Sequence, residues 1–170
     1  MPETRADFDY NALCSSVALL ADAASRQKKH ITLVVISTVL PDTSQHKILP
    51  LLEGNKYVSY VYAPMFIAQT TVVEDTLHPE FVLLGIDKSD SRGVEEVGSF
   101  FETFHPRAKL RFMSVASAEL TKVAYNVFLG LKIVAANSIM EIAHKTGADC
   151  DEVSDALAAA TDRVVSSKYM

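Results

Sequence analysis

Lys122 and Asn126 are the two residues of this sequence whose types and spacing point most directly to chemistry. They lie four positions apart in residues 117–132, a largely apolar segment that predicts one long helix. Side chains at positions i and i+4 share a helix face, so the amine and the amide should project together. A buried lysine needs a partner or a task. The simpler interpretation places both residues on the solvated edge of an amphipathic helix.

The composition limits the classes of protein to which this chain can belong. Its 170 residues are enough for one domain or one and a half, and 49% hydrophobic residues argue against disorder. A net charge of -5 gives no support for nucleic-acid binding, which needs a basic stripe. The two cysteines form no CxxC pair and the five histidines show no metal-ligand spacing, so we expect free thiols and no metal site.

The first residues and the apolar runs bear on localisation. Residues 1–4 are polar and acidic, without the basic and apolar regions of a signal peptide. The longest apolar run is shorter than the roughly 18 to 20 residues that a membrane span needs. We therefore expect a cytoplasmic protein without a membrane partner.

Strands alternate with helices in the first two thirds of the chain, and helices alone follow. This order predicts an α/β layer with parallel strands and then a helical domain, with a boundary near Ser114. The domains would be residues 1–113 and 114–170. A long loop is expected at residues 63–79. The expected strands are residues 31–36, 57–62, 81–86 and 109–113, and the expected helices are 10–26, 44–52, 94–104, 116–145 and a last one from Asp149 or Asp151 to 160.

Four segments, in the same order, resemble motifs of the nucleotide-sugar 6-dehydrogenases, the UDP-glucose/GDP-mannose dehydrogenase family. They are residues 35–43 (VISTVLPDT), residues 62–69 (YAPMFIAQ) with Asp75 and Pro79 beyond them, residues 118–129 (AELTKVAYNVFL), and residues 146–163 around TGAD, EV and DR. The resemblance covers nearly the whole chain. It implies the distal half of a Rossmann-like NAD-binding domain with a mostly parallel sheet, followed by a helical central domain built on one long dimerisation helix.

The resemblance also assigns roles to residues. Enzymes of the family oxidise a sugar CH2OH to a carboxylate with NAD, so the implied ligands are NAD and a nucleotide sugar. Lys122 would supply positive charge where oxyanion character develops, Asn126 would hydrogen-bond nearby, and Thr38 would lie near the nicotinamide and the catalytic water. Ser37 and Thr38 would contact the cofactor. The implied substrate-binding residues are Pro64, Met65, Phe66, Ile67, Gln69, Lys122 and Asn126.

The sequence departs from the family pattern in its acid-base residues and in its glycines. Met65 and Gln69 occupy positions where the family has carboxylates, and Asp42 replaces the usual glycine. None of the six glycines forms a GxGxxG turn, and neither Cys14 nor Cys150 lies in the Gly-rich loop that carries the family nucleophile. We therefore expect a dehydrogenase fragment that is incomplete alone.

Several interpretations remain open. The chain is either part of a dehydrogenase, alone or completed by a complementary chain, or a non-catalytic remnant that keeps the dimerisation helix. An unrelated α/β binding protein is a third, weaker alternative. In the first two cases we expect a homodimer through residues 116–145, because a helix that is apolar on several faces needs more than one packing partner.

Overall fold

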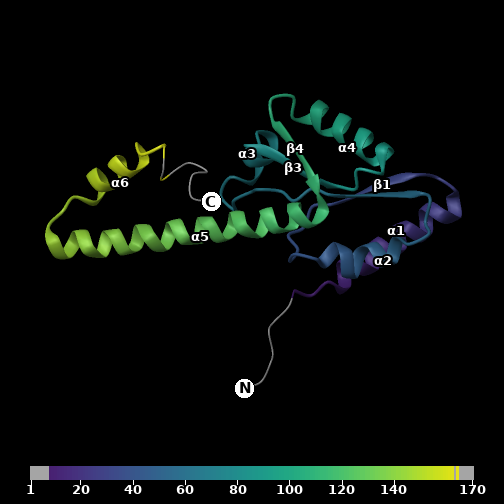
Figure 1. Cartoon of the computed structure of the whole chain (residues 1–170), viewed down its shortest axis with the longest axis horizontal. Helices are drawn as coiled ribbons and strands as arrows, with labels where there is room; N and C mark the ends of the chain where they lie inside the picture. The colour runs from purple at the N-terminus through teal and green to yellow at the C-terminus, as the bar shows by residue number, and fades with distance from the viewer. Residues whose placement is uncertain (1–7, 163, 165–170) are drawn as a thin grey trace, which may run out of the picture. The chain divides into compact units, whose positions relative to one another are not determined.

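The computed structural model describes residues 8–162 and 164 (Figure 1). Contacts divide the chain into two compact units, Met1–Ala124 and Tyr125–Met170, and the division falls inside one long helix. The domain boundary predicted near Ser114 lies earlier, at the start of that helix, whose first turns pack on the sheet. Arg163, part of the last family-like motif, and residues 1–4 lie outside the described residues.

A four-stranded sheet in the order β1-β2-β3-β4 organises the first unit. The pairs β1–β2 and β3–β4 are parallel, and a short antiparallel pairing, Val61 with Ile86 and Tyr62 with Gly85, joins the two halves. The predicted α/β class with a mostly parallel sheet and one long helix is confirmed. The strands are β1 Ile31–Val35, β2 Val58–Tyr62, β3 Phe81–Ile86 and β4 Lys109–Ser114.

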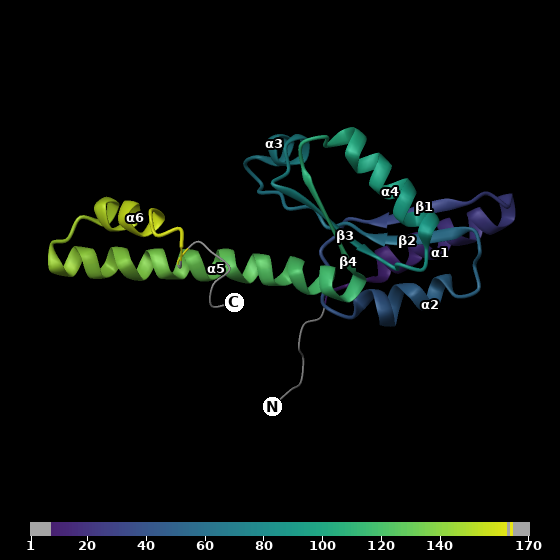
Figure 2. The same cartoon turned by 45° about the horizontal axis from the view of Figure 1, so that its top comes forward.

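Helices cover both faces of the sheet, as Figure 2 shows. On one face, Val17 and Ile48 from the helices pack with Tyr62 in a buried cluster. On the other face, Val97 packs with Leu84. The central strands β2 and β3 therefore bury side chains on both faces of the sheet, which explains their largely apolar sequences. The covering helices are α1 Asn11–Gln27 and α2 Leu49–Leu52 on the first face and α4 Ser91–Phe104 on the second.

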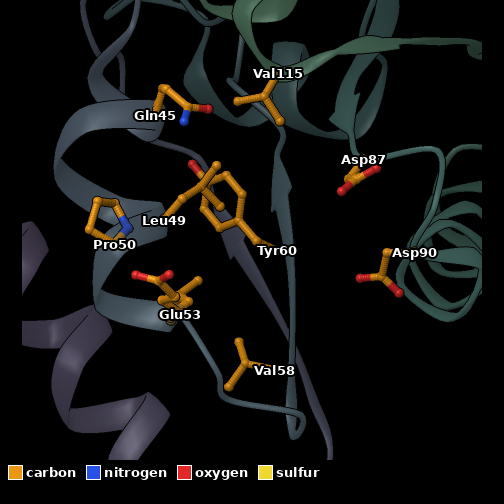
Figure 3. Close-up of a pocket in the computed structure, with 10 residues that line it drawn as sticks. Gln45, Leu49, Pro50, Glu53, Val58, Tyr60, Asp87, Asp90 and Val115 are labelled. Carbon is orange, nitrogen blue, oxygen red and sulfur yellow. The ribbon is translucent and has the colours of Figure 1, made fainter.

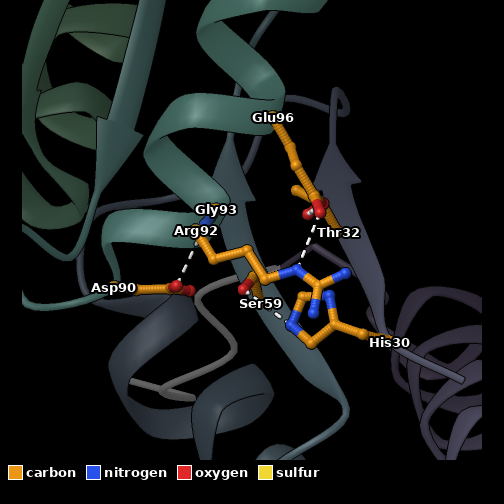
Figure 4. A network of polar contacts seen from close by, with 7 residues as sticks. All are labelled: His30, Thr32, Ser59, Asp90, Arg92, Gly93 and Glu96. Carbon is orange, nitrogen blue, oxygen red and sulfur yellow. Dashed lines mark hydrogen bonds and ion pairs between the residues drawn. The ribbon is translucent and has the colours of Figure 1, made fainter.

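Side-chain hydrogen bonds fix the start of α4 against the sheet (Figure 4). The Asp90 carboxylate accepts a bond of 3.0 Å from the Gly93 N–H and so caps the helix. One turn later, the Glu96 carboxylate accepts bonds from the Thr32 hydroxyl on β1 and from Arg92 Nε, the latter 2.8 Å long. These two bonds lower the pKa of the Glu96 carboxyl, and the bond from Thr32 has the larger effect.

Two segments differ from their sequence-based predictions. The helix expected at residues 44–52 is a π-helical turn, Ser44–Ile48, followed by the short α2. Pro50 lacks the N–H that an α-helix would donate to the His46 carbonyl, and the wider turn before it accommodates its ring. The long loop expected at residues 63–79 contains a short helix, α3 Val72–Leu77.

The long helix α5, Val115–Thr146, begins directly after β4 and packs its first turns on the sheet. Ala118 is fully buried there. A Cβ added to Gly85 of β3 would lie 2.7 Å from the Ala118 Cβ, closer than carbon atoms approach without displacement. A glycine is therefore needed at this position for the helix to lie so close to the strand.

The second unit contains the rest of α5 and α6, Cys150–Ala158. As predicted, α5 ends before Gly147, which has a φ of 75°, and the Asp149 carboxylate caps α6 by accepting bonds from Asp151 N and Glu152 N. Most side chains of α5 beyond Asn126 are exposed. By length and composition alone, α5 is also long and apolar enough to cross a membrane, a property that packing helices share.

Candidate functional site

Lys122 is buried in the first unit, under the loop that follows β2. Its Nζ donates a hydrogen bond of 2.8 Å to the Met65 carbonyl and lies 4.5 Å from the centre of the Phe66 ring. The side chain is only 6% exposed, and this burial lowers the pKa of the Lys122 amine because the charged form loses water. Among the described residues, no carboxylate forms an ion pair with it.

This burial corrects one inference from the sequence. The simpler interpretation of the sequence places Lys122 on the solvated edge of an amphipathic helix, where the amine would be exposed. Instead, residues 64–69 of the same chain fold over it and remove water. Lys122 therefore contacts the loop that the family resemblance assigns to substrate binding.

The loop that covers Lys122 has a buried beginning and an exposed end. Pro64 is buried, Met65 and Phe66 are half-buried, and Ile67 and Gln69 are exposed. The Phe66 ring packs against Phe81 at the start of β3, with 4.6 Å between the ring centres. The contact from Met65 to the lysine uses its backbone carbonyl, so the loss of a carboxylate at this position leaves that contact intact.

Asp75 of α3 holds the far end of the same loop. Its carboxylate accepts hydrogen bonds from the Ala68 N–H, 2.9 Å long, and from the Thr71 hydroxyl, 2.7 Å long. These two bonds lower the pKa of the Asp75 carboxyl, and the bond from Ala68 has the larger effect. The short helix missed by sequence reasoning therefore shapes the loop.

Ser37 and Thr38 follow β1, which lies beside β2, the strand that leads to the loop covering Lys122. The Ala63 N–H donates a bond of 2.8 Å to the Val35 carbonyl, so the carboxyl ends of β1 and β2 lie side by side. Ser37 is exposed, Thr38 is half-buried, and both line a hollow of about 380 Å³ together with Tyr10. Among the described residues, no hydrogen bond joins Thr38 to Lys122.

Glu119 is a site residue that sequence reasoning missed. It is 1% exposed, and its carboxylate oxygens accept hydrogen bonds from the backbone N–H groups of Asp42, 2.8 Å long, and Ser44, 2.7 Å long. Asp42 has a φ of 68°, the left-handed region that a glycine would adopt more easily. One signal in the sequence could have indicated a buried role for Glu119. It is a charged residue on the apolar side of the predicted helix, three positions before Lys122.

Hydroxyl groups extend this polar cluster beneath the loop of residues 38–44. The Ser44 and Tyr60 hydroxyls lie 2.6 Å apart, and the Thr43 hydroxyl donates a bond of 3.1 Å to the Tyr10 oxygen. Burial raises the pKa of the Tyr60 hydroxyl and, to about 12, that of the Tyr62 hydroxyl. Both phenols therefore stay protonated and neutral at physiological pH.

The first two turns of α5 thus hold both loops that follow the parallel strands. Glu119 fixes residues 42–44, and Lys122 fixes residues 65–66. Asn126, one turn farther along the helix, is exposed and belongs to the second unit. The structure therefore brings Lys122 to the predicted sugar loop and leaves Asn126 without a described side-chain contact.

A second hollow, of about 460 Å³, lies beside β2, between α2 and the residues that follow β3 (Figure 3). It contains none of the predicted site residues, but the carboxylates of Glu53, Asp87 and Asp90 line it. Asp87 accepts bonds from Ser89, and Asp90 caps α4, so two of the three carboxylates already have structural partners. In the described part of the chain, no group of three or more metal-ligating side chains is placed to hold an ion.

Comparisons with known proteins agree with this arrangement. Residues 116–170 match the family model "UDP-glucose/GDP-mannose dehydrogenase family, central domain". UDP-glucose 6-dehydrogenase of Drosophila melanogaster is 28% identical over 162 residues, 92% of this chain and 33% of that protein. The enzyme of Pongo abelii is 34% identical over 109 residues, 63% of this chain and 22% of that protein. This chain is similar to nucleotide-sugar dehydrogenases. It spans about a third or less of the length of these two relatives.

Solved structures give the same result. A crystal structure of a ternary complex of GDP-mannose dehydrogenase from Pseudomonas aeruginosa matches 100% of this chain and 39% of its own, with a TM-score of 0.84 and 25% identity. A UDP-glucose dehydrogenase from Pyrobaculum islandicum matches 92% of this chain and 36% of its own, with a TM-score of 0.79, and at 24% identity supports the fold alone.

Glu119→Ala should destabilise the first unit by about 2 to 4 kcal/mol, because it leaves two backbone donors without their charged acceptor. Urea unfolding would measure this change. Glu141→Ala on the same helix is the matched control, since Glu141 pairs with Lys145 at an exposed position and such pairs contribute about 0 to 1 kcal/mol. Equal losses in the two variants would contradict the role assigned to Glu119.

Lys122→Met should stabilise the fold at pH 7 by about 1 kcal/mol, because a buried cation is removed. The folded pKa of Lys122 lies below its ordinary 10.5, so the unfolded chain binds more protons between these two values. Wild-type stability should therefore rise with pH in this window, and the advantage of the variant should shrink. Urea unfolding at several pH values would test this, with exposed Lys56→Met as control. An advantage that grows with pH would contradict it.

Proposed function

We propose that this chain carries the sugar-binding loop and the lysine of an NAD-dependent nucleotide-sugar dehydrogenase, which oxidises a sugar CH2OH to a carboxylate. The observation that carries the proposal is the buried Lys122 amine, which lies against residues 65 and 66 and forms no ion pair with a carboxylate of the described residues. An unpaired cation in a desolvated site is suited to stabilise a developing oxyanion.

Each residue contributes to binding or to charge stabilisation. Lys122 would donate to the sugar oxygen on which negative charge develops, in place of its present bond to the Met65 carbonyl. Asn126 would supply an amide hydrogen bond to the same group, and the exposed end of the loop, Ile67 and Gln69, would contact the sugar. Because the Lys122 amine is already desolvated, little solvent has to reorganise around it when negative charge develops on the sugar oxygen.

The hollow beside Ser37 and Thr38 is the place for the nicotinamide end of the cofactor. Its volume of about 380 Å³ and the hydroxyl groups of its lining residues Tyr10, Ser16, Ser37 and Thr38 suit part of a polar ligand. NAD supplies the hydride acceptor when bound. The GxGxxG turn that would hold its pyrophosphate is absent from these 170 residues, so a complementary chain or segment would have to supply that contact.

A second candidate function is a non-catalytic dimerisation module. Met65 and Gln69 favour it, because they remove the two carboxylates that would act in acid-base or water-activating steps. Ligand binding separates the two functions more sharply than turnover, since both predict that the chain alone is inactive.

The purified chain should bind UDP-glucose or GDP-mannose without reducing NAD. Saturation-transfer NMR would detect the binding, and absorbance at 340 nm would detect NADH. Lys122→Met should weaken binding roughly tenfold, the effect of losing one charge-assisted hydrogen bond.

Lys56→Met removes an exposed lysine remote from the loop and is the matched control. Absence of binding to either sugar nucleotide would favour the non-catalytic module. Steady NADH formation by the chain alone, abolished by Lys122→Ala, would show that the site is complete and would contradict the proposed incompleteness. Activity that appears only when a chain with both missing motifs is added would support the proposal.

The second unit supports a homodimer through α5. Val127, Leu131 and Val134 lie at positions i, i+4 and i+7 of one helix face, and they are 54%, 58% and 62% exposed. An apolar stripe of this kind packs against a partner surface. A C2 interface would pair the same stripe from two copies.

Leu131→Glu should shift the protein from dimer to monomer, because it buries a charge in the apolar stripe. Sedimentation velocity at micromolar concentration would measure the shift. Asn137→Glu places the same charge at an exposed polar position of the helix and should leave the dimer intact. A monomeric wild type, or one that binds lipid vesicles through α5, would contradict the dimer.

A further inference from the structure

A third hollow, of about 420 Å³, lies on the sheet face that α5 covers, at the edge formed by β4. Alternate residues of a strand point to the same face, and the register places Phe81 beside Lys109 and Leu83 beside Arg111. These four side chains and Met113 line the hollow. It therefore has an apolar floor and two cationic groups at one side.

The two cations have no hydrogen-bonding or ion-pairing side-chain partner in the described part of the chain. Lys109 and Arg111 are exposed, and no side-chain hydrogen bond or ion pair involves either of them among the described residues. Glu80 also lines the hollow, but it lies beyond ion-pairing distance of both. Like charges two residues apart on one strand face repel each other, and a bound anion would relieve that repulsion.

The hollow adjoins the Lys122 site through two aromatic rings. Phe81 lines the hollow and packs against Phe66, with 4.6 Å between the ring centres. Phe66 in turn lies 4.5 Å from Lys122 Nζ. The hollow with its two cations therefore lies next to a third cation, although the chain as a whole carries a net charge of -5.

We propose that Lys109 and Arg111 form a binding site for a diphosphate group. Arginine forms bidentate bonds to phosphate oxygens, lysine adds a point charge, and a second phosphate group gives each cation its own acceptor. The hollow has the size of a small-ligand site. The proposal is independent of the proposed dehydrogenase function, because it needs no sugar and no hydride transfer.

Titration calorimetry of the full chain with sodium pyrophosphate tests the site. Arg111→Gln and Lys109→Gln should each weaken binding roughly tenfold, and the double variant should abolish it. Arg107→Gln is the matched control, since Arg107 is exposed, lies outside the strand and does not line the hollow. Glu80→Gln should strengthen binding roughly twofold to threefold, because it removes the only carboxylate that lines the hollow.

Two further arms identify the source of the diphosphate. UDP binding that is tighter than pyrophosphate binding and still depends on Arg111 would assign the site to a nucleotide, whereas preference for pyrophosphate would assign it to the free anion. Absence of saturable binding, or equal weakening by Arg107→Gln and Arg111→Gln, would overturn the proposal. Failure to bind a nucleotide sugar would leave the pyrophosphate result unaffected, so the two proposals can fail separately.

Discussion

The carboxylate of Glu119, held by two backbone N–H groups, is the interaction on which the site depends. It fixes residues 42–44 to the first turn of α5 and so determines where that helix begins its path across the sheet. Lys122, three positions later, then reaches the loop after β2. Through these two side chains, one helix holds both the β1 loop and the β2 loop.

Burial of Lys122 is a property of this chain and needs no further domain. The loop of residues 64–69 supplies a carbonyl and an aromatic face, which partly replace the water that the amine loses. The pKa of Lys122 is nevertheless lowered, because these two contacts only partly replace the water that the charged amine loses. A site that disfavours its own cation in the resting state favours an anionic ligand, and this is the physical basis of the proposed function.

One helix serves two environments. In the first unit, α5 packs so closely that Ala118 requires a glycine opposite it. In the second unit, the same helix presents apolar side chains such as Leu131 to solvent. Exposed apolar side chains of this kind are suited to pack against another surface.

The sequence by itself predicted most of the elements and the resemblance to the nucleotide-sugar dehydrogenases. Helical periodicity and Gly147 placed α5 near its observed bounds, and short apolar runs predicted β1, β2 and β3, because these signals depend on neighbours in the chain. The short helix α3 was missed because six residues are too few to show a period.

Only the tertiary structure decided what surrounds Lys122. Its partner, Met65, is 57 positions away in sequence, and the Asp42 amide is 77 positions from Glu119. Spacing within one helix predicts which side chains share a face, but it contains no information about which loop will cover that face. Burial and desolvation arise from such distant contacts, and for this reason the exposure of Lys122 was misjudged and Glu119 was overlooked.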